Sequence, residues 1–336
     1  MAGTPDLTSQ PLVSVVTPVY NGGEYLSQCI ESVLAQTYQH WEYVVVNNCS
    51  TDRSLEIAQN YARRDSRIRV HSNSEFLAAL QNQNHALRLI SAESKYCKVV
   101  HADDWLFPEC LAHMVGLAEA NPSVGIVGSY RLDDVRVNLD GLPYPSTVVP
   151  GREICRLSLL GRLYVFGSPT SLLLRSELIR GREKMYDEAH LWADSEVCYE
   201  LLGRCDFGFV HQVLTYTRRH AGAVSSFAQR FNTYSLSRVV LLAKYGGMYL
   251  DAHAYEQCLG EVLADYYRFL ARSLVKRRGR EFWEYHRRHL DASGYSMNWS
   301  QLAGAAIVEA VRALLCPKSL VRALATRQER SAAEAS

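Results

Sequence analysis

Two adjacent carboxylates follow an apolar run in the first third of the chain. Asp103 and Asp104 come shortly after the run Tyr96–Val100, with His101 between. Neighbouring carboxylates repel each other unless a cation compensates them, and their hard oxygen atoms suit Mg²⁺ or Mn²⁺, which also bind substrate phosphates. The doublet is equally typical of acids that cap a helix, here the one expected after Pro108. Asp103 and Asp104 are therefore candidate metal ligands.

A third acid, Asp194, stands at the predicted start of a helix that continues through Val197, Leu201 and Leu202. A helix N-terminus stabilises an ionised carboxylate, and an ionised aspartate beside a substrate hydroxyl can act as a general base. The simpler interpretation is a helix N-cap without a catalytic role. Glu196 is a rival acid further into the helix. Asp194 is the candidate catalytic base.

Polar side chains at the ends of the first two predicted strands are candidates for binding a nucleotide. Pro18, Val19, Tyr20 and Asn21 combine an aromatic ring with an amide, which can stack on a base and hydrogen-bond to it. Proline and asparagine also favour ordinary turns, which is the alternative interpretation. Asn48 offers a further amide, just ahead of residues that can cap the following helix.

A cationic cluster, Arg218, Arg219 and His220, follows a short apolar run near the end of the α/β pattern. Arginines can neutralise a departing diphosphate, and histidine can ligate a metal. The alternative is an exposed group of surface charges, where most arginines lie.

The elements that must position these residues alternate along the first 130 residues. The segments Val13–Thr17, Trp41–Val46, Ile68–His71, Tyr96–Val100 and Val124–Val127 predict strands, and the segments between them have helical periodicity. This βαβαβ order implies a mostly parallel sheet covered on both faces. Ligands of such sheets bind outside the carboxyl ends of the strands, where the loops with the candidate residues begin.

The rest of the chain gives weaker signals. Residues 130–150 are expected to be irregular, because they contain three prolines among Asp, Asn and Gly, and the pattern is helical from about Phe231. Leu302–Leu315 is too short to span a membrane and carries two charges, so a packed core helix is favoured over a helix on a membrane surface. The basic segment Lys276–Arg280 fits a solvated helix end or contact with anionic lipid.

The overall composition argues against several classes of protein. The chain has 336 residues, and 36 Lys and Arg balance 35 Asp and Glu, which is unlike a dedicated nucleic-acid binder. Nine cysteines without a Cys-x-x-Cys pair favour free buried thiols over a zinc or thioredoxin-like site. The first ten residues lack the features of a signal peptide. We therefore expect a cytoplasmic protein, with peripheral contact at the inner face of the membrane as the alternative.

In this order the motifs resemble those of the family 2 glycosyltransferases, which have the GT-A fold. The resemblance covers about residues 11–226 and rests on VSVVTPVYN at the first strand, VVVNNCSTD at the second, VVHADDWLFPEC after the fourth, WADSEVCYELL and LTYTRRH. It implies an α/β GT-A domain over residues 11–228, with a Rossmann-like, mostly parallel sheet. A helical C-terminal region over residues 229–336 would serve acceptor binding, oligomerisation or membrane contact.

The resemblance also implies a role for each candidate residue. The positions implied to bind a nucleotide-sugar donor are Pro18, Val19, Tyr20, Asn21, Asn48, Asp103, Arg218 and Arg219. Those implied to hold Mg²⁺ or Mn²⁺ are Asp104, Asp103 and His220, with Asp104 as the direct ligand. Asp194 would be the base of an inverting transfer from a nucleotide-diphosphate sugar to a glycan or glycolipid acceptor, in bacterial polysaccharide or glycolipid assembly.

The chain departs from the family pattern near three strand ends. Asn47 and Asn48 stand where relatives commonly have an acidic pair, His101 where many have an acid, and Gln83 where many have Arg. Two other functions stay open. A sugar nucleotidyltransferase is disfavoured, because residues 18–25 hold no Lys or Arg to bind a triphosphate. The second is a non-catalytic sugar-nucleotide-binding or scaffolding protein on the same fold.

Overall fold

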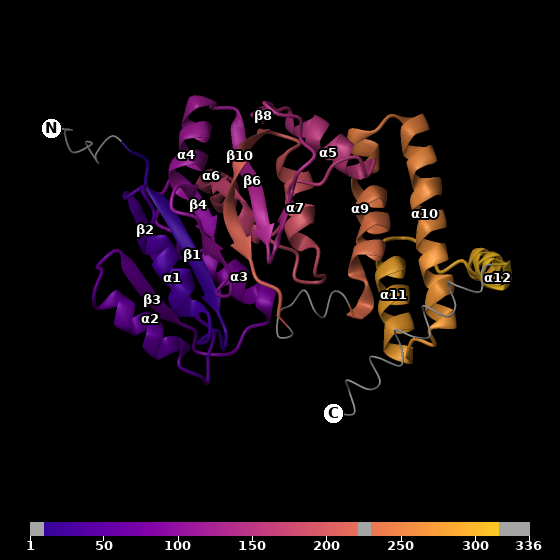
Figure 1. Ribbon diagram of the computed structural model, residues 1–336, viewed down its shortest axis with the longest axis horizontal. Coiled ribbons are helices and arrows are strands. Elements are labelled where there is room, and N and C mark those ends of the chain that lie inside the picture. Colours follow the sequence, from indigo (N-terminus) through magenta and orange to yellow (C-terminus); the bar gives the residue numbers. More distant parts are fainter. Residues whose placement is uncertain (1–9, 221–229, 316–336) are drawn as a thin grey trace. The chain divides into compact units, whose positions relative to one another are not determined.

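The computed structural model describes residues 10–220 and 230–315. The chain divides into two compact units, Met1–Ser226 and Phe227–Ser336. The first unit contains the β-sheet, and the second consists of long helices (Figure 1).

A mixed sheet forms the centre of the first unit. Its strands lie in the order β3-β2-β1-β4-β9-β6-β10-β5, with β7 beside β6 and β8 beside β10. β1 pairs in parallel with β2 and β4, β2 with β3, and β6 with β10, whereas β5, β7, β8 and β9 run antiparallel to their neighbours. The strands are β1 (Val13–Val19), β2 (Trp41–Asn47), β3 (Ile68–Ser72), β4 (Tyr96–Val99), β5 (Trp105–Leu106), β6 (Val124–Asp133), β7 (Arg136–Asn138), β8 (Val148–Val149), β9 (Leu173–Arg175) and β10 (Asp206–Thr217).

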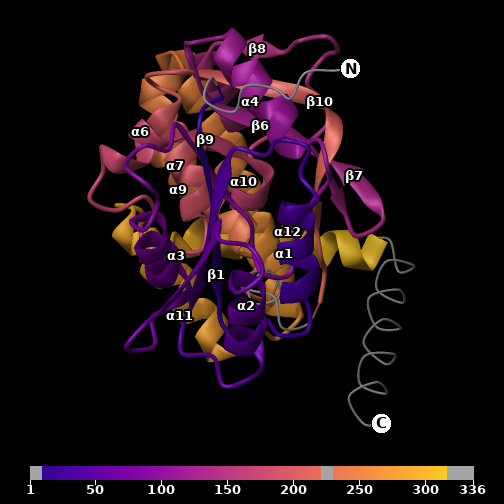
Figure 2. The ribbon, with the colours of Figure 1, turned by 90° about the vertical axis from the view of Figure 1, so that its left-hand side faces the viewer.

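Helices cover both faces of this sheet, which confirms the predicted α/β architecture. Neighbouring residues of β1, such as Val15 and Val16, are both fully buried, as expected for a strand between two helical layers. In Figure 2, α1 and α3 lie on opposite sides of β1. The helices of this unit are α1 (Leu26–Leu34), α2 (Ser54–Ala62), α3 (Ala79–Leu87), α4 (Cys110–Ala120), α5 (Gly151–Leu159), the 3₁₀ helix η2 (Pro169–Ser171), α6 (Ser176–Arg180) and α7 (Ala193–Leu201).

The parallel register brings three strand ends to one edge. Val13 of β1 is paired with Trp41 of β2 and with Tyr96 of β4, so the three strands start level and run in the same direction. The polar loops that follow these strands therefore emerge side by side, at the edge where ligands bind in sheets of this kind.

The region between residues 130 and 150 differs from the sequence expectation. It is not wholly irregular: β6 continues to Asp133 and turns into β7, and β8 adds a short strand beside β10. The single strand β10 also joins two apolar runs of the sequence, residues 207–210 and 213–216, with register shifts on both sides of Val213. Such β-bulges bend a strand without ending it, which is why the two runs look separate in the sequence.

Four long helices make up the described part of the second unit: α9 (Thr233–Tyr249), α10 (Ala252–Val275), α11 (Arg280–Ala292) and α12 (Trp299–Leu315). Asp251 caps α10 by accepting the Ala254 backbone N–H at 2.9 Å. Inside the unit, His286 bonds through its two ring nitrogens to the Tyr266 hydroxyl and the Phe231 carbonyl, each at 2.8 Å. Burial lowers the pKa of His286 to about 4.

The expectation of a packed core helix over Leu302–Leu315 is wrong for the side chains that the structure describes. A helix does form, but between residues 299 and 312 only Leu302 is buried. The apolar composition of this segment reflects an exposed apolar face rather than burial. None of the helices within residues 10–220 and 230–315 has the length and hydropathy needed to cross a membrane.

Candidate active site

Hydrogen bonds join the loops that follow β1 and β2. Asn21 adopts a left-handed backbone (φ 49°), and its side-chain oxygen accepts the Thr51 backbone N–H at 2.8 Å. The Asn21 N–H donates to the Ser50 hydroxyl at 3.1 Å, and the Gly23 N–H donates to the Asp52 carboxylate at 2.8 Å. The two loops therefore form a single rim at this edge of the sheet.

The residues predicted on β1 divide between this rim and the core. Tyr20 is half exposed and packs edge-to-face on Phe76, with 4.9 Å between ring centroids. Pro18 is partly exposed, whereas the Val19 side chain is buried in the core. Val19 contributes its carbonyl, which accepts the Asn48 backbone N–H at 2.8 Å. At the rim, the exposed Tyr20 ring is therefore free to stack on a ligand ring, whereas the buried Val19 side chain cannot contact a ligand.

The Asn48 side chain is buried and holds a neighbouring peptide group. Its Nδ2 donates to the Leu77 carbonyl at 2.8 Å, and its Oδ1 accepts the Leu77 N–H and the Asn73 side-chain amide, each at 2.9 Å. These bonds fix the segment that leads into α3. The amide is occupied by protein groups here, and base recognition by Asn48 stays a prediction.

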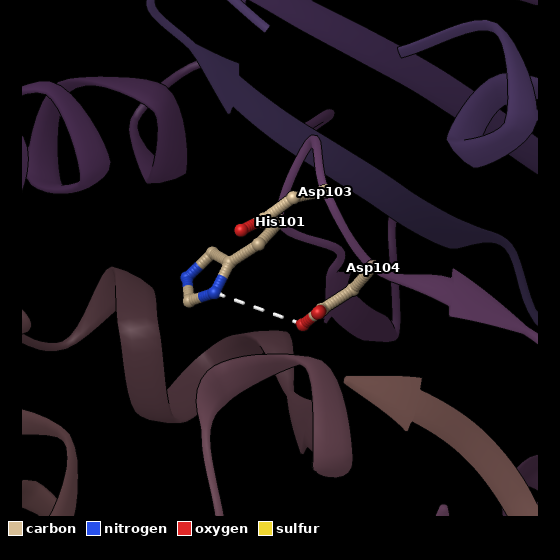
Figure 3. A group of neighbouring side chains, drawn as sticks. All are labelled: His101, Asp103 and Asp104. Atoms are coloured by element: carbon tan, nitrogen blue, oxygen red, sulfur yellow. Dashed lines mark ion pairs between the residues drawn. The ribbon is translucent and has the colours of Figure 1, made fainter. Parts of the chain in front are cut away.

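The acidic group lies in the turn between β4 and β5 (Figure 3). One possible ligand atom from each of His101, Asp103 and Asp104 lies within 4.8 Å of the others, and His101 Nδ1 is 3.9 Å from Asp104 Oδ2. Burial raises the pKa of Asp104 to about 6; the charge of His101 opposes this shift and that of Asp103 adds to it. One imidazole and two carboxylates are a donor set that fits a divalent cation, whose charge would relieve the burial of Asp104.

The predicted cationic cluster reaches the acidic group from the end of β10. His220 Nε2 lies 2.9 Å from Asp103 Oδ2. The Arg218 backbone N–H donates to Asp104 Oδ1 at 3.2 Å, and its Nε donates to the Asp103 carbonyl at 3.2 Å. The two segments are more than 110 residues apart in sequence, and the structure brings them together as the metal prediction requires.

The Arg218 guanidinium is held between aromatic rings. It lies 4.3 Å from the centroid of the Tyr25 ring and 5.3 Å from that of Trp105. Trp105 in turn stacks on Tyr216, with centroids 3.4 Å apart and rings within 9° of parallel. A guanidinium fixed in this way presents its remaining N–H groups in one orientation.

Arg219 points to a different partner from its neighbour. Its guanidinium forms a bidentate ion pair with Asp133 at the end of β6, and this pair lowers the pKa of Asp133. Arg219 therefore joins β6 to β10. A contact with a diphosphate, which was predicted for it, would have to compete with this carboxylate.

Asp194 lies in the first turn of α7, where most but not all of its surface is buried. Its Oδ1 accepts the Ser195 backbone N–H at 2.8 Å. Burial raises the pKa of Asp194, against the lowering effects of this hydrogen bond and of the nearby His101 charge. His101 thus interacts with the carboxylates of both Asp194 and Asp104.

Sequence reasoning missed Thr170 in this group. Its buried hydroxyl accepts the His101 backbone N–H at 3.1 Å, and a hydrogen bond from the same side chain lowers the pKa of Asp104. Thr170 belongs to the 3₁₀ helix η2. The local sequence holds no signal for the contact, because it joins residues 69 positions apart.

A second group of possible metal ligands, Asp187, His190 and Glu196, was also not predicted. His190 Nε2 lies 2.8 Å from Glu196 Oε2 and 3.7 Å from Asp187 Oδ2. The signal was present, since all three flank Asp194 within nine residues. In a sequence, a histidine with two carboxylates nearby only weakly indicates a metal site when no predicted strand end brings them together.

Comparisons with known proteins agree on one family. The family model for glycosyl transferase family 2 matches residues 14–180. The glycosyltransferase GlyG of Streptococcus pneumoniae is 33% identical over 144 residues, which are 43% of this chain and 46% of GlyG. A Bacillus subtilis protein provisionally named the teichuronic acid biosynthesis glycosyltransferase TuaG is 40% identical over 95 residues, 28% of this chain and 37% of TuaG. The matched regions thus span less than half the length of these two relatives.

The fold is that of solved glycosyltransferases. The structure of S. aureus TarS 1-349 in complex with UDP-GlcNAc has a TM-score of 0.63 and 17% identity, over 84% of this chain and 80% of that one. The mannosyltransferase PcManGT from Pyrobaculum calidifontis, in complex with GDP-Man and Mn²⁺, has a TM-score of 0.56 and 18% identity. The match covers 97% of this chain and 86% of PcManGT. The sheet with its acidic edge is of the GT-A type. The chain belongs to glycosyl transferase family 2.

Proposed function

We propose that this protein transfers a sugar from a nucleotide-diphosphate sugar to an acceptor hydroxyl with inversion at the anomeric carbon. The family membership and the nucleotide sugars bound to its structural neighbours support this class of donor. The name of one relative refers to teichuronic acid biosynthesis, which supports a role in bacterial polysaccharide or glycolipid assembly. The observation that carries the proposal is the group His101, Asp103 and Asp104 at the carboxyl edge of the parallel strands, which Arg218 and His220 contact from the end of β10.

Asp104, Asp103, His220 and His101 are the residues that would hold Mg²⁺ or Mn²⁺. Their donor atoms and mutual distances fit such an ion, and a structural neighbour contains Mn²⁺. When bound, the ion supplies positive charge to a diphosphate that becomes more negative as it leaves. Arg218, held by Tyr25, is placed to add a fixed positive charge beside the same group.

Asp194 would act on the acceptor. Its carboxylate takes the proton of the acceptor hydroxyl while that oxygen forms a bond to the anomeric carbon. The bond from the anomeric carbon to the diphosphate oxygen breaks on the opposite face, and its electron pair leaves with the nucleoside diphosphate. A single displacement of this kind inverts the configuration and needs no enzyme nucleophile. Tyr20 and Pro18, at the rim, are proposed to contact the nucleotide base.

The test is a metal-dependent assay on a panel of UDP- and GDP-sugars. Slow release of a nucleoside diphosphate that requires Mn²⁺ or Mg²⁺ supports the proposal. Formation of pyrophosphate from a sugar phosphate and a nucleoside triphosphate would instead indicate a nucleotidyltransferase. Binding of a donor without any turnover would indicate a non-catalytic protein on this fold.

A matched pair of variants then assigns the base. Asp194→Asn removes the proton acceptor with little change in shape, whereas Asp140→Asn changes an exposed aspartate of the same unit. We expect the first variant to keep donor affinity and lose turnover and the second to behave as the wild type. Wild-type turnover in Asp194→Asn would remove Asp194 from the role.

A further inference from the structure

Helix α12 turns the charged side chain of Glu309 inward and several apolar side chains outward. The Glu309 side chain is only 13% exposed and accepts two hydrogen bonds from Arg272 of α10, at 3.0 and 3.2 Å. Away from this pair, Ile307, Val308 and Val311 are 65%, 51% and 47% exposed. An ordinary surface helix of a globular protein has the opposite arrangement. The sequence of α12 is therefore arranged to present an apolar surface.

This surface continues along the helix. At about 100° per residue, one half of α12 carries side chains that are almost all apolar and all exposed. We call it the outer face of α12; it consists of Trp299, Ala303, Gly304, Ile307, Val308, Ala310 and Val311. An exposed apolar patch on one helix face marks an interaction site.

Exposed basic residues follow the part of α10 that contacts α12. The exposed Leu274 and Val275 end α10, and an exposed basic segment, Lys276 to Arg280, follows them directly. The ion pair between Arg272 and Glu309 joins the last turns of α10 to α12, so the basic segment begins four residues after a contact with α12. Residues 227–336 contain 16 Lys and Arg against 10 Asp and Glu, although the whole chain has a net charge of only +1.

We propose that the outer face of α12 docks on an anionic lipid surface, with the basic segment on the lipid phosphates. Apolar side chains with an adjacent tryptophan and lysine or arginine residues are what such a surface recognises. Pairing with a second copy of the chain is the alternative occupant. It would bring two basic segments close together, and like charges repel. An anionic lipid surface neutralises the same charges.

The experiment is sedimentation of the full chain with vesicles of phosphatidylcholine alone or mixed with phosphatidylglycerol. We expect binding only to the mixed vesicles, and weaker binding as salt increases. Ile307→Asp with Val311→Asp should reduce the partition coefficient at least about tenfold, because charged groups oppose insertion of the apolar face. Lys276→Gln with Arg277→Asn should reduce it about thirtyfold, since two cations are lost.

Arg63→Gln with Arg64→Gln is the matched control, because it removes two exposed cations just after α2 and should leave binding unchanged. Equal binding to both vesicle types, or no loss in the α12 variant, would overturn the proposal. So would a dimer in analytical ultracentrifugation that the α12 variant converts to a monomer, without vesicle binding by the wild type. Ile307→Ser, with thermal unfolding measured alongside, replaces the double variant if that protein does not fold.

Discussion

The edge of the sheet and the outer face of α12 depart from the usual distribution of residues in opposite ways. At the sheet edge polar groups are buried: Asp104 is 3% exposed, and Asn48 is 2% exposed. On α12 apolar groups are exposed, while Glu309 is turned inward. Buried polar groups and exposed apolar patches are the informative exceptions to the general rule. The first arrangement suits a small charged ligand, and the second suits an extended apolar surface. The sheet edge is accordingly the region proposed for catalysis, and the outer face of α12 the region proposed for docking.

The largest effect is expected at Asp194. Asp194→Asn should lower the transfer rate about 1,000-fold, within the range for loss of a general base. The pKa of Asp194 is raised by burial, and a base must be ionised to accept a proton. The wild-type rate should therefore fall as the pH drops through this raised pKa, above the usual range of aspartate. A pH–rate profile measures this fall in rate at acidic pH. If a partly active variant of Asp194 shows the same fall, another group must be responsible for it.

Replacement of Asp104 should have the next largest effect. Asp104→Asn should lower turnover about 100-fold and weaken Mn²⁺ binding, because one charged oxygen ligand is lost from the group. Calorimetric titration with Mn²⁺ in the absence of donor separates binding from catalysis. Asp134→Asn, outside the group, is the control. Undiminished Mn²⁺ affinity in Asp104→Asn would place the ion elsewhere and break the link between the buried carboxylate and a cation.

Asn48→Ala should affect stability more than chemistry. The substitution leaves the N–H and carbonyl of the partly buried Leu77 without their partner, which costs about 1–2 kcal/mol of unfolding free energy. Urea unfolding measures this loss. Asn48→Asp keeps the acceptor for the Leu77 N–H but loses the donor, so we expect a smaller loss. A stable Asn48→Ala protein with weakened donor binding would instead support direct base recognition.

Lys98 provides a buried charge that no proposed function uses. It is fully buried on β4, with Nζ 3.5 Å from Met114 Sδ, and burial lowers its pKa. The unfolded chain binds this proton more tightly than the folded protein, so stability should rise as the pH approaches about 10.4, the ordinary lysine value. Lys98→Met should stabilise the fold by about 1–2 kcal/mol at pH 7 and reduce this pH dependence. A destabilised variant would show that Lys98 has a required partner.

The smallest effect is expected from the α12 variants on chemistry. Ile307→Asp with Val311→Asp should release nucleoside diphosphate from a soluble donor at the wild-type rate, because no residue of the proposed active site lies on α12. If the variant instead released nucleoside diphosphate much more slowly, α12 would contribute to the chemistry as well as to docking.

The first strands and the acidic edge were predictable from sequence because their signals are local. Continuous β-branched runs such as Val44–Val46 can be buried only in a covered sheet, and the doublet Asp103–Asp104 follows the predicted strand Tyr96–Val100. Long-range pairings were not predictable. Arg219 was assigned to a diphosphate, but its pairing with Asp133 depends on how β6 and β10 align. The apolar composition of Leu302–Leu315 predicts a packed core helix, although most of its described side chains are exposed. Hydropathy records the apolar character of a side chain and not the direction in which it points.

The stack of Trp105 on Tyr216, beneath the Arg218 guanidinium, places an indole directly after Asp104 in the chain. Indole emission changes when a nearby charge or ring moves. Loading of Mn²⁺ or of a sugar nucleotide should therefore be visible in the intrinsic fluorescence of the unlabelled protein, and Trp105→Phe should remove that signal. The site carries its own optical reporter, and occupancy can be followed before any acceptor is known.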